Sequence, residues 1–283
     1  MNICYFKTGN IVLRVETPDP LDIKEPYSLF LCEQEKTDVN VIFRYGNIAE
    51  PSGMLFAETD SVDVFEDDGA FYFFYHITGE KVYYALRKVN KEKPSHHEII
   101  IPHEYEGKIW TRLVFSLINF DDIAAMMNAS VFHASFIEYN GYAILFTAPC
   151  GTGKSTQAAL WEKHQGAETI NGDKVLIYED NGSFFAAGLP FSGSSDICKN
   201  RILPVKAIVR LSQAKENTVT RLTGINAYKA VFEGCYHSKW SADFNKITSD
   251  VAVSFAGNVP VYHLACLPDK DATEVLKNEL LKI

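Results

Sequence analysis

Long apolar runs and paired cysteines are both missing from this 283-residue sequence. No run of 18 or more apolar residues occurs, so no membrane span is expected. Residues 1–16 are too polar and alternating for a signal peptide. The six cysteines are scattered without a C-x-x-C pair, which argues against a zinc site or a disulfide framework and favours a reducing cytoplasm.

Positive charge is also scarce in this sequence. Lys and Arg total 27 against 36 Asp and Glu, which gives a formal net charge of −9. A protein that binds nucleic acid through its phosphate backbone needs an excess of positive charge, so no nucleic-acid partner is expected. A local pocket for a single nucleotide remains compatible with this balance. With 47% apolar residues the chain can bury the core of one large domain or two smaller ones.

The first part of the chain has the patterns of β-structure. Strand-like runs occupy residues 10–16, 39–45 and 96–102. Residues 65–88 have the pattern of consecutive hairpins that turn at Asp68-Gly69 and Thr78-Gly79. We therefore predict a β-rich N-terminal domain over residues 1–107.

The pattern becomes helical from Lys108 onward, and we place a domain boundary there. One helical face is marked by Trp110, Leu113, Val114 and Leu117. Asp121-Asp122 should start a second helix. Strands are then expected at 131–139, 142–148, 174–180, 183–188, 204–211 and 258–267, and helices at 153–164, 225–234, 243–256 and 270–282. This alternation predicts an α/β domain over residues 108–283.

Residues 148–156, APCGTGKST, have the pattern of a phosphate-binding loop between a strand and a helix. Glycines in such a loop let backbone N–H groups curl around phosphate oxygens, and the helix dipole adds to the attraction. Lys154 should reach the β- and γ-phosphates, and the Ser155 hydroxyl should contact Mg²⁺. Ala148 replaces the usual first glycine. The predicted phosphate-binding residues are Pro149, Cys150, Gly151, Thr152, Gly153, Lys154, Ser155 and Thr156.

A hairpin should bring a histidine to this loop. A two-residue turn at Asn140-Gly141 places His133 opposite Ala148. His133 is therefore either a buried core residue or a ligand for metal or phosphate.

A second hairpin should bring an aspartate to the same edge. A two-residue turn at Asn181-Gly182 places Asp173 opposite Pro190 and carries the loop 188–195 towards this edge. Asp173 has the chemistry of a metal anchor, since Mg²⁺ bound to a nucleotide needs a carboxylate oxygen from the protein. The alternative is a turn aspartate that follows a glycine.

Residues 131–160, VFHASFIEYNGYAILFTAPCGTGKSTQAAL, followed by TINGDKVLI at 169–177, resemble the catalytic core of HPr kinase/phosphorylase and of phosphoenolpyruvate carboxykinase. The resemblance is strongest to the HPr-kinase-related group that includes kinases of ribosomally made peptides, such as lasso-peptide kinases. It implies an α/β P-loop core with a mixed sheet, preceded by a β-rich domain. The likeness extends over residues 130–265 and is strong over 131–177.

Carried over to this sequence, the resemblance implies a nucleotide-phosphate role for Gly151 and for residues 153–156. It implies that Asp173 acts near the metal and that His133 is a metal ligand, as in the carboxykinase branch. One departure is Gly172, which stands where the family has the first of two aspartates. Either Asp173 takes both roles, or His133 serves as base, or base catalysis is weak.

The segment after the second hairpin offers further candidates. Lys199 and Arg201 could stabilise the transferred phosphoryl group, the alternative being solvated charges at a strand entrance. Ser192, Ser194 and Ser195 either line a channel for an acceptor or only form a flexible connection.

These features predict an ATP-dependent kinase that uses Mg²⁺, or Mn²⁺, and transfers the γ-phosphoryl group to a hydroxyl of a peptide or protein, with serine favoured. The expected catalytic residues are Asp173, Lys154, His133 and Arg201, and the expected metal ligands are Ser155, Asp173 and His133. The β-rich domain would recognise the acceptor. A small-molecule kinase and a degenerate nucleotide-binding regulatory module are the alternatives, whereas the carboxykinase reaction is not expected. The sequence leaves open whether the chain forms a homo-oligomer.

Overall fold

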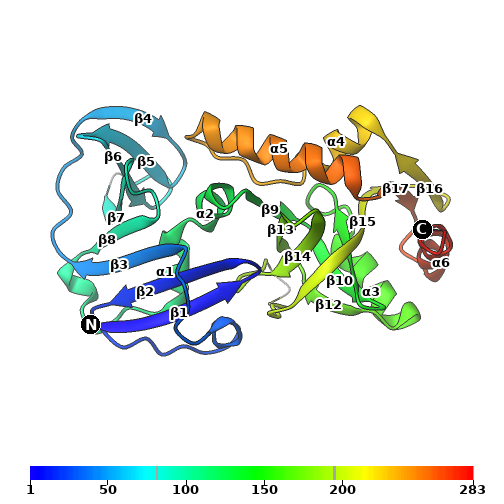
Figure 1. The fold of residues 1–283 in the computed structure, drawn as a ribbon, viewed down its shortest axis with the longest axis horizontal. Helices are drawn as coiled ribbons and strands as arrows, with labels where there is room; N and C mark the ends of the chain where they lie inside the picture. The colour runs from blue at the N-terminus through cyan, green and yellow to red at the C-terminus, as the bar shows by residue number, and fades with distance from the viewer. Residues whose placement is uncertain (81, 194–195, 283) are drawn as a thin grey trace. The chain divides into compact units, whose positions relative to one another are not determined.

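The computed structural model describes residues 1–80, 82–193 and 196–282, and the chain forms two compact units (Figure 1). Unit 1 contains Met1–Ile123 and Ser238–Ala242, and unit 2 contains Ala124–His237 and Asp243–Ile283. The sequence placed the boundary at Lys108, whereas unit 1 continues to Ile123 and includes a short segment from much later in the chain. Ser194 and Ser195 lie outside the described residues.

Unit 1 is built on a mixed sheet. Its strands are β1 Asn2–Thr8, β2 Ile11–Thr17, β3 Val39–Tyr45, β4 Met54–Glu58, β5 Val62–Asp67, β6 Ala70–His76, β7 Tyr83–Asn90 and β8 His96–Ile101. Their order across the sheet is β1-β2-β3-β8-β7-β6-β5-β4. The predicted turn at Asp68-Gly69 is confirmed, since Asp67 pairs with Ala70 and both turn residues have positive φ. The sequence did not reveal β1 and β4.

Two short helices follow this sheet, α1 Thr111–Ile118 and α2 Phe120–Met126. Leu113, Val114 and Leu117 are buried as predicted. Trp110 is not on that buried face, because it is extended, precedes the helix as its N-cap residue and is 50% exposed.

Helix α1 belongs to unit 1 because its C-terminal carbonyls accept hydrogen bonds from the sheet. The Tyr75 hydroxyl donates to Leu117 O at 2.8 Å, and Arg87 Nη1 donates to Ile118 O at 3.0 Å. These bonds satisfy carbonyl groups that a helix end otherwise leaves unpaired. They explain why the boundary lies after α1 rather than at Lys108.

Trp240 accounts for the return of Ser238–Ala242 to unit 1. Its ring packs edge-on against Phe71 and Phe73, with centroids 4.8 and 5.0 Å away. Its indole Nε1 donates to Asp122 Oδ1 at 3.1 Å. Asp122 also pairs with Arg87 Nη2 at 3.0 Å, and both side chains are buried. The segment therefore helps to satisfy a buried ion pair, which would be costly if left incomplete.

Unit 2 carries a second mixed sheet. Its strands are β9 Ala129–His133, β10 Ser135–Tyr139, β11 Tyr142–Thr147, β12 Glu168–Asn171, β13 Lys174–Asp180, β14 Ser183–Gly188, β15 Ile202–Gln213, β16 Thr218–Leu222 and β17 Val261–Cys266. The main path runs β12-β10-β11-β15-β14-β13-β9, and β17 pairs with β15 and β16. Strands β11, β15 and β17 are parallel to one another, and the remaining pairs are antiparallel.

Both hairpin registers predicted for this region are confirmed. Tyr139 pairs with Tyr142 around Asn140-Gly141, and Asp180 pairs with Ser183 around Asn181-Gly182.

The expected single strand over residues 131–139 is wrong, because the chain changes partners at Ala134 and forms β9 and β10. His133 consequently pairs with Lys174 of β13 instead of facing Ala148.

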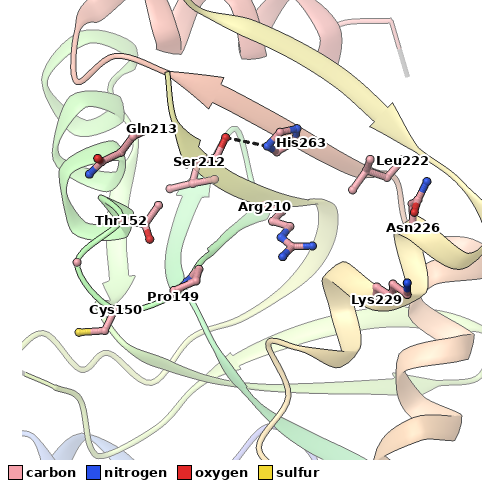
Figure 2. A pocket seen from close by; sticks show the side chains of 12 residues that line it. Pro149, Cys150, Thr152, Arg210, Ser212, Gln213, Leu222, Asn226, Lys229 and His263 are labelled. Atoms are coloured by element: carbon pink, nitrogen blue, oxygen red, sulfur yellow. Dashed lines mark hydrogen bonds between the residues drawn. The ribbon is translucent and has the colours of Figure 1, made fainter. Parts of the chain in front are cut away.

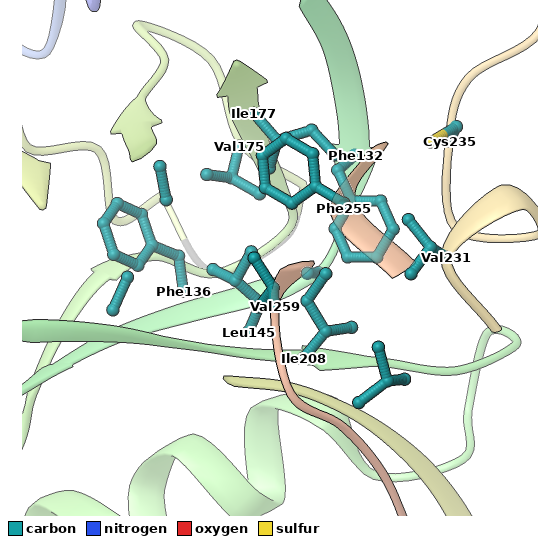
Figure 3. Close-up of a cluster of buried hydrophobic side chains, with 14 of the residues drawn as sticks. Phe132, Phe136, Leu145, Val175, Ile177, Ile208, Val231, Cys235, Phe255 and Val259 are labelled. Atoms are coloured by element: carbon teal, nitrogen blue, oxygen red, sulfur yellow. The ribbon is translucent and has the colours of Figure 1, made fainter. Parts of the chain in front are cut away.

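Helices cover both faces of the parallel strands. They are α3 Lys154–Gln165, α4 Gly224–Phe232, α5 Ala242–Asn258 and α6 Lys270–Leu280. One buried cluster joins α4 and α5 to Phe132, Leu145 and Ile208 (Figure 3). Another joins α3 and α6 to the opposite face. Burial on both faces explains the continuous apolar run of β11. Among the described helices, none is both long and apolar enough to cross a membrane.

Candidate functional site

A glycine-rich loop, residues 148–153, connects β11 to α3. Gly151 and Gly153 have φ values of 78° and 119°, which glycine adopts far more readily than other residues. Gly153 is the N-cap residue of α3, and no described side chain caps this helix end. The first N–H groups of α3 therefore lack an intrahelical or side-chain acceptor within the described residues and can bind an anion.

Lys154 folds back across this loop. Its Nζ donates to Ala148 O at 2.9 Å and to Pro149 O at 3.5 Å, and the residue is 8% exposed. Burial lowers the pKa of Lys154, while the charge of Asp173 acts in the opposite direction. A phosphate in the loop would offer this ammonium group a charged partner in place of two carbonyl oxygens.

His133 and Asp173 meet beside the loop. His133 ends β9, Asp173 directly precedes β13, and His133 Nδ1 lies 3.2 Å from Asp173 Oδ1. This is an ion-pair distance, although the ring nitrogen is not aligned for a hydrogen bond. The neighbouring His133 lowers the pKa of Asp173, and the charges of Lys174 and Lys154 act in the same direction. Asp173 is therefore a carboxylate at neutral pH.

The backbone keeps this pair near the loop. Thr147, the last residue of β11, donates its Oγ1 hydrogen bond to His133 O at 3.0 Å. On the other side, the buried Asn171 accepts from the N–H groups of Asp173 and Lys174 through its Oδ1. Sequence reasoning missed Asn171, whose position two residues before Asp173 is typical of an Asx turn.

The segment after β14 also approaches Asp173, as the second hairpin predicted. Asn171 Nδ2 donates to Leu189 O and Phe191 O, both at 3.1 Å. A methyl group added at Gly193 would lie 3.0 Å from Asp173 Cγ. The described part of this loop therefore passes directly over the carboxylate.

The candidate cations Lys199 and Arg201 are not brought to this pair. Lys199 Nζ binds Glu168 Oε1 at 2.7 Å, and Arg201 Nη2 binds Glu138 Oε2 at 2.5 Å. Glu138 pairs with Ala143, near the turn of the β10–β11 hairpin. The end of β11 that leads into the glycine-rich loop is four residues farther on, a distance of about 13 Å at roughly 3.3 Å per residue.

Arg210 is a further cation that the sheet places near the loop. It pairs in parallel register with Thr147 on one side and with His263 on the other. Its Nη2 binds Glu233 Oε2 at 2.7 Å, and 38% of its side chain is exposed. The sequence alone does not distinguish it from other basic residues of β15, because the register between β11 and β15 is set by long-range pairing.

A hollow of about 740 Å³ adjoins the glycine-rich loop (Figure 2). Figure 2 shows the Ser212 hydroxyl bonded to His263 Nε2, at 2.9 Å. The volume lies within the range of small-molecule sites, roughly 300–1,000 Å³. The lining includes Pro149, Cys150, Gly151, Thr152, Arg210, Ser212, Asn226, Lys229 and His263.

A family model described as SynChlorMet cassette protein ScmC matches residues 104–269. The chain belongs to the ScmC family. No curated protein matches the sequence. Among solved structures, the HPr(Ser) kinase/phosphatase from Coxiella burnetii is similar to this ScmC-family chain with 12% identity and a TM-score of 0.34, over 54% of this chain and 91% of that chain. This likeness is too slight to support a function.

Sequence analysis did not identify two further residues of this candidate site. Lys174 lies opposite His133 in the β9–β13 ladder, and its Nζ is 4.4 Å from the centroid of the Tyr236 ring. Tyr236 also presents its ring at 90° to that of His133, with centroids 6.3 Å apart. The position of Lys174 directly after Asp173 was a usable signal, whereas Tyr236 comes from a distant part of the chain.

The side chains of this candidate site suit a nucleotide-bound metal better than a metal held by protein alone. Within the described residues, no three His, Cys, Asp or Glu side chains form a cluster that could hold an ion. Mg²⁺ usually binds one or two carboxylates and completes its shell with phosphate oxygens and water. Asp173 offers such a carboxylate, and the buried His133 Nδ1 has no hydrogen-bond partner in the described part of the chain. This donor set fits Mg²⁺ carried by a nucleotide.

Proposed function

We propose that this ScmC-family protein is an ATP-dependent kinase that transfers the γ-phosphoryl group to a hydroxyl of a peptide or protein, with serine as the favoured acceptor. The observation that carries the proposal is the uncapped N-terminus of α3 behind two glycines with positive φ, with the buried ammonium group of Lys154 across the loop. This arrangement suits a polyphosphate, since N–H groups and an ammonium group converge on one anion.

Each residue around the loop then has a defined task. The loop N–H groups and Lys154 bind the β- and γ-phosphates. Ser155, Asp173 and His133 would hold Mg²⁺, or Mn²⁺, which would neutralise phosphate charge when bound. The acceptor oxygen forms a bond to Pγ as the bond from Pγ to the bridging oxygen of ADP breaks. The proton of the acceptor hydroxyl passes to Asp173, to His133 if that ring is not a metal ligand, or to water if base catalysis is weak.

The two sides of the glycine-rich loop suggest how the substrates are arranged. The hollow lined by Arg210, Asn226 and His263 has the size and polarity to receive the ribose and base of the nucleotide. The acceptor would then approach from the side of Asp173. Recognition of that acceptor by the β-rich unit 1 is part of the same proposal.

The test uses γ-³²P-ATP, Mg²⁺, the purified protein and a size-fractionated lysate of the source cells. We expect label in the peptide or protein fraction. Lys154→Ala and Asp173→Asn should each abolish transfer, and circular dichroism should show that both variants remain folded.

Three other outcomes of this test would contradict the proposal or part of it. Label only in small molecules would identify a metabolite kinase. Binding of ATP without any transfer would identify a nucleotide-binding module, in which Gly172 marks the missing carboxylate. Full activity in Asp173→Asn would refute the metal role of this residue.

A further inference from the structure

Lys174 is on the same face of the sheet as His133. The two residues are directly opposed in the antiparallel ladder between β9 and β13, and opposed residues project from one face. The next pair along the ladder, Phe132 and Val175, is fully buried in the core. Because side chains alternate between faces along a strand, Lys174 and His133 project away from that core.

Aromatic rings hold the Lys174 ammonium group in place. Its Nζ lies 4.4 Å from the centroid of the Tyr236 ring and 5.6 Å from that of Phe191. Both distances are within the range of cation–π attraction. Rings that bind a lysine in this way restrict its side chain without neutralising its charge.

The charge of Lys174 is therefore available for a ligand. Among the described side chains, no carboxylate lies within 4.0 Å of Lys174 Nζ, in contrast to Lys199 and Arg201. The charge of Lys174 acts on Asp173, the residue that directly precedes it in the chain. The site thus has a further cation besides Lys154 and Arg210, on the side of the expected acceptor.

We propose that Lys174 contacts the transferred phosphoryl group and stabilises its negative charge during transfer, with Tyr236 as the residue that positions it. This inference rests on the proposed kinase function. In phosphoryl transfer the charge spreads over three equatorial oxygens while the group lies between donor and acceptor. A cation on the acceptor side interacts more strongly with the phosphoryl group in the transition state than with ATP bound before transfer. It therefore lowers the barrier to transfer without strengthening the binding of ATP.

The test needs no knowledge of the acceptor. Aluminium fluoride bound with ADP and Mg²⁺ mimics the phosphoryl group in the transition state. Titration calorimetry can compare the affinity of the protein for ADP and Mg²⁺ with and without aluminium fluoride. We expect Lys174→Met to bind ADP with the affinity of the wild type. The factor by which aluminium fluoride increases that affinity should be about 100-fold smaller in this variant. Lys174→Arg should retain part of it, and Tyr236→Leu should lose part of it.

Lys206→Met is the matched control. Lys206 Nζ also lies over a tyrosine, 5.6 Å from the centroid of Tyr142, but at the turn end of the β10–β11 hairpin. We expect this variant to match the wild type. Thermal unfolding of each variant shows whether a lost effect comes from a lost fold or from the lost contact between Lys174 and the phosphoryl group. If Lys174→Met does not fold, Lys174→Arg is used in its place.

The outcomes separate the two proposals. If Lys174→Met keeps the full effect of aluminium fluoride, the role of Lys174 is refuted while the kinase function stands. If the wild type binds neither ADP nor ATP, the proposed function fails and the role of Lys174 fails with it. An equal loss in Lys174→Met and Lys206→Met would also refute the specific contact.

Discussion

Gly234 is not a residue of the candidate site, but a methyl group added there should displace residues that position it. A Cβ at this position would be 2.3 Å from Phe132 Cε2 and 2.8 Å from Thr147 Oγ1. Carbon atoms in contact prefer separations of about 3.5–4.0 Å, so the neighbours would have to move by about 1 Å. Phe132 is fully buried in the cluster that also contains Val231 and Phe255 (Figure 3).

We expect Gly234→Ala to lower the free energy of unfolding by about 1–3 kcal/mol, the usual cost of overpacking a core. The functional effect should be larger, because Gly234 O accepts the hydrogen bond of His133 N at 2.7 Å. Moving this carbonyl moves His133, and a displacement of about 1 Å at a catalytic site can reduce the rate about 100-fold.

Urea unfolding, followed by tryptophan fluorescence, measures the first effect, and the transfer assay measures the second. Gly257→Ala is the control, because Gly257 is in α5, is exposed and has nothing within 4 Å of its added methyl group among the described residues. That substitution should stabilise the protein by no more than about 1 kcal/mol. If Gly234→Ala is as stable and active as the wild type, the packing argument is refuted.

Two other predictions concern Cys150 and His97. Cys150 is exposed in the glycine-rich loop. Mg²⁺-ATP at about ten times its dissociation constant should slow the alkylation of Cys150 by about tenfold, as measured by peptide mapping. Equal labelling with and without nucleotide would count against the loop as the nucleotide site. Burial lowers the pKa of His97 from 6.5 to about 3, so the folded state binds fewer protons than the unfolded state between these pH values. Stability should therefore fall as the pH is lowered below about 6.5, by up to about 2 kcal/mol at about pH 5. Urea unfolding of His97→Gln, whose amide can still donate to Pro94 O, should show a smaller decrease over this range; an unchanged decrease would assign it to other groups.

The features that the sequence predicted correctly are those fixed by neighbouring residues. The turns at Asn140-Gly141 and Asn181-Gly182 have the positive φ values that asparagine and glycine tolerate, and they set both hairpin registers. The start of α3 at Lys154 follows from the glycines that precede it. Local chemistry was therefore enough to identify the loop and to place Asp173 at the correct end of its hairpin.

The features that the sequence did not predict depend on distant pairings. The break at Ala134 exists because Ala134 N donates to Asp173 O, a bond between segments that no local pattern connects. Arg210, which the sequence did not single out, lies at the loop because of the parallel register of β15 with β11. Side-chain chemistry identified basic residues as candidates, but only the sheet decides which of them lies level with Thr147.

The return of Ser238–Ala242 to unit 1 has a consequence for biosynthesis. Trp240 lies 118 residues after its hydrogen-bond partner Asp122, so the ribosome must translate most of unit 2 before unit 1 can be completed. At about 5–20 residues per second, this delay amounts to roughly 6–24 s. Until Trp240 emerges from the exit tunnel, the nascent chain exposes the parts of the Phe71 and Phe73 rings that Trp240 later covers. Chaperones that bind exposed aromatic surface on nascent chains should therefore find their substrate in the half of this protein that is translated first.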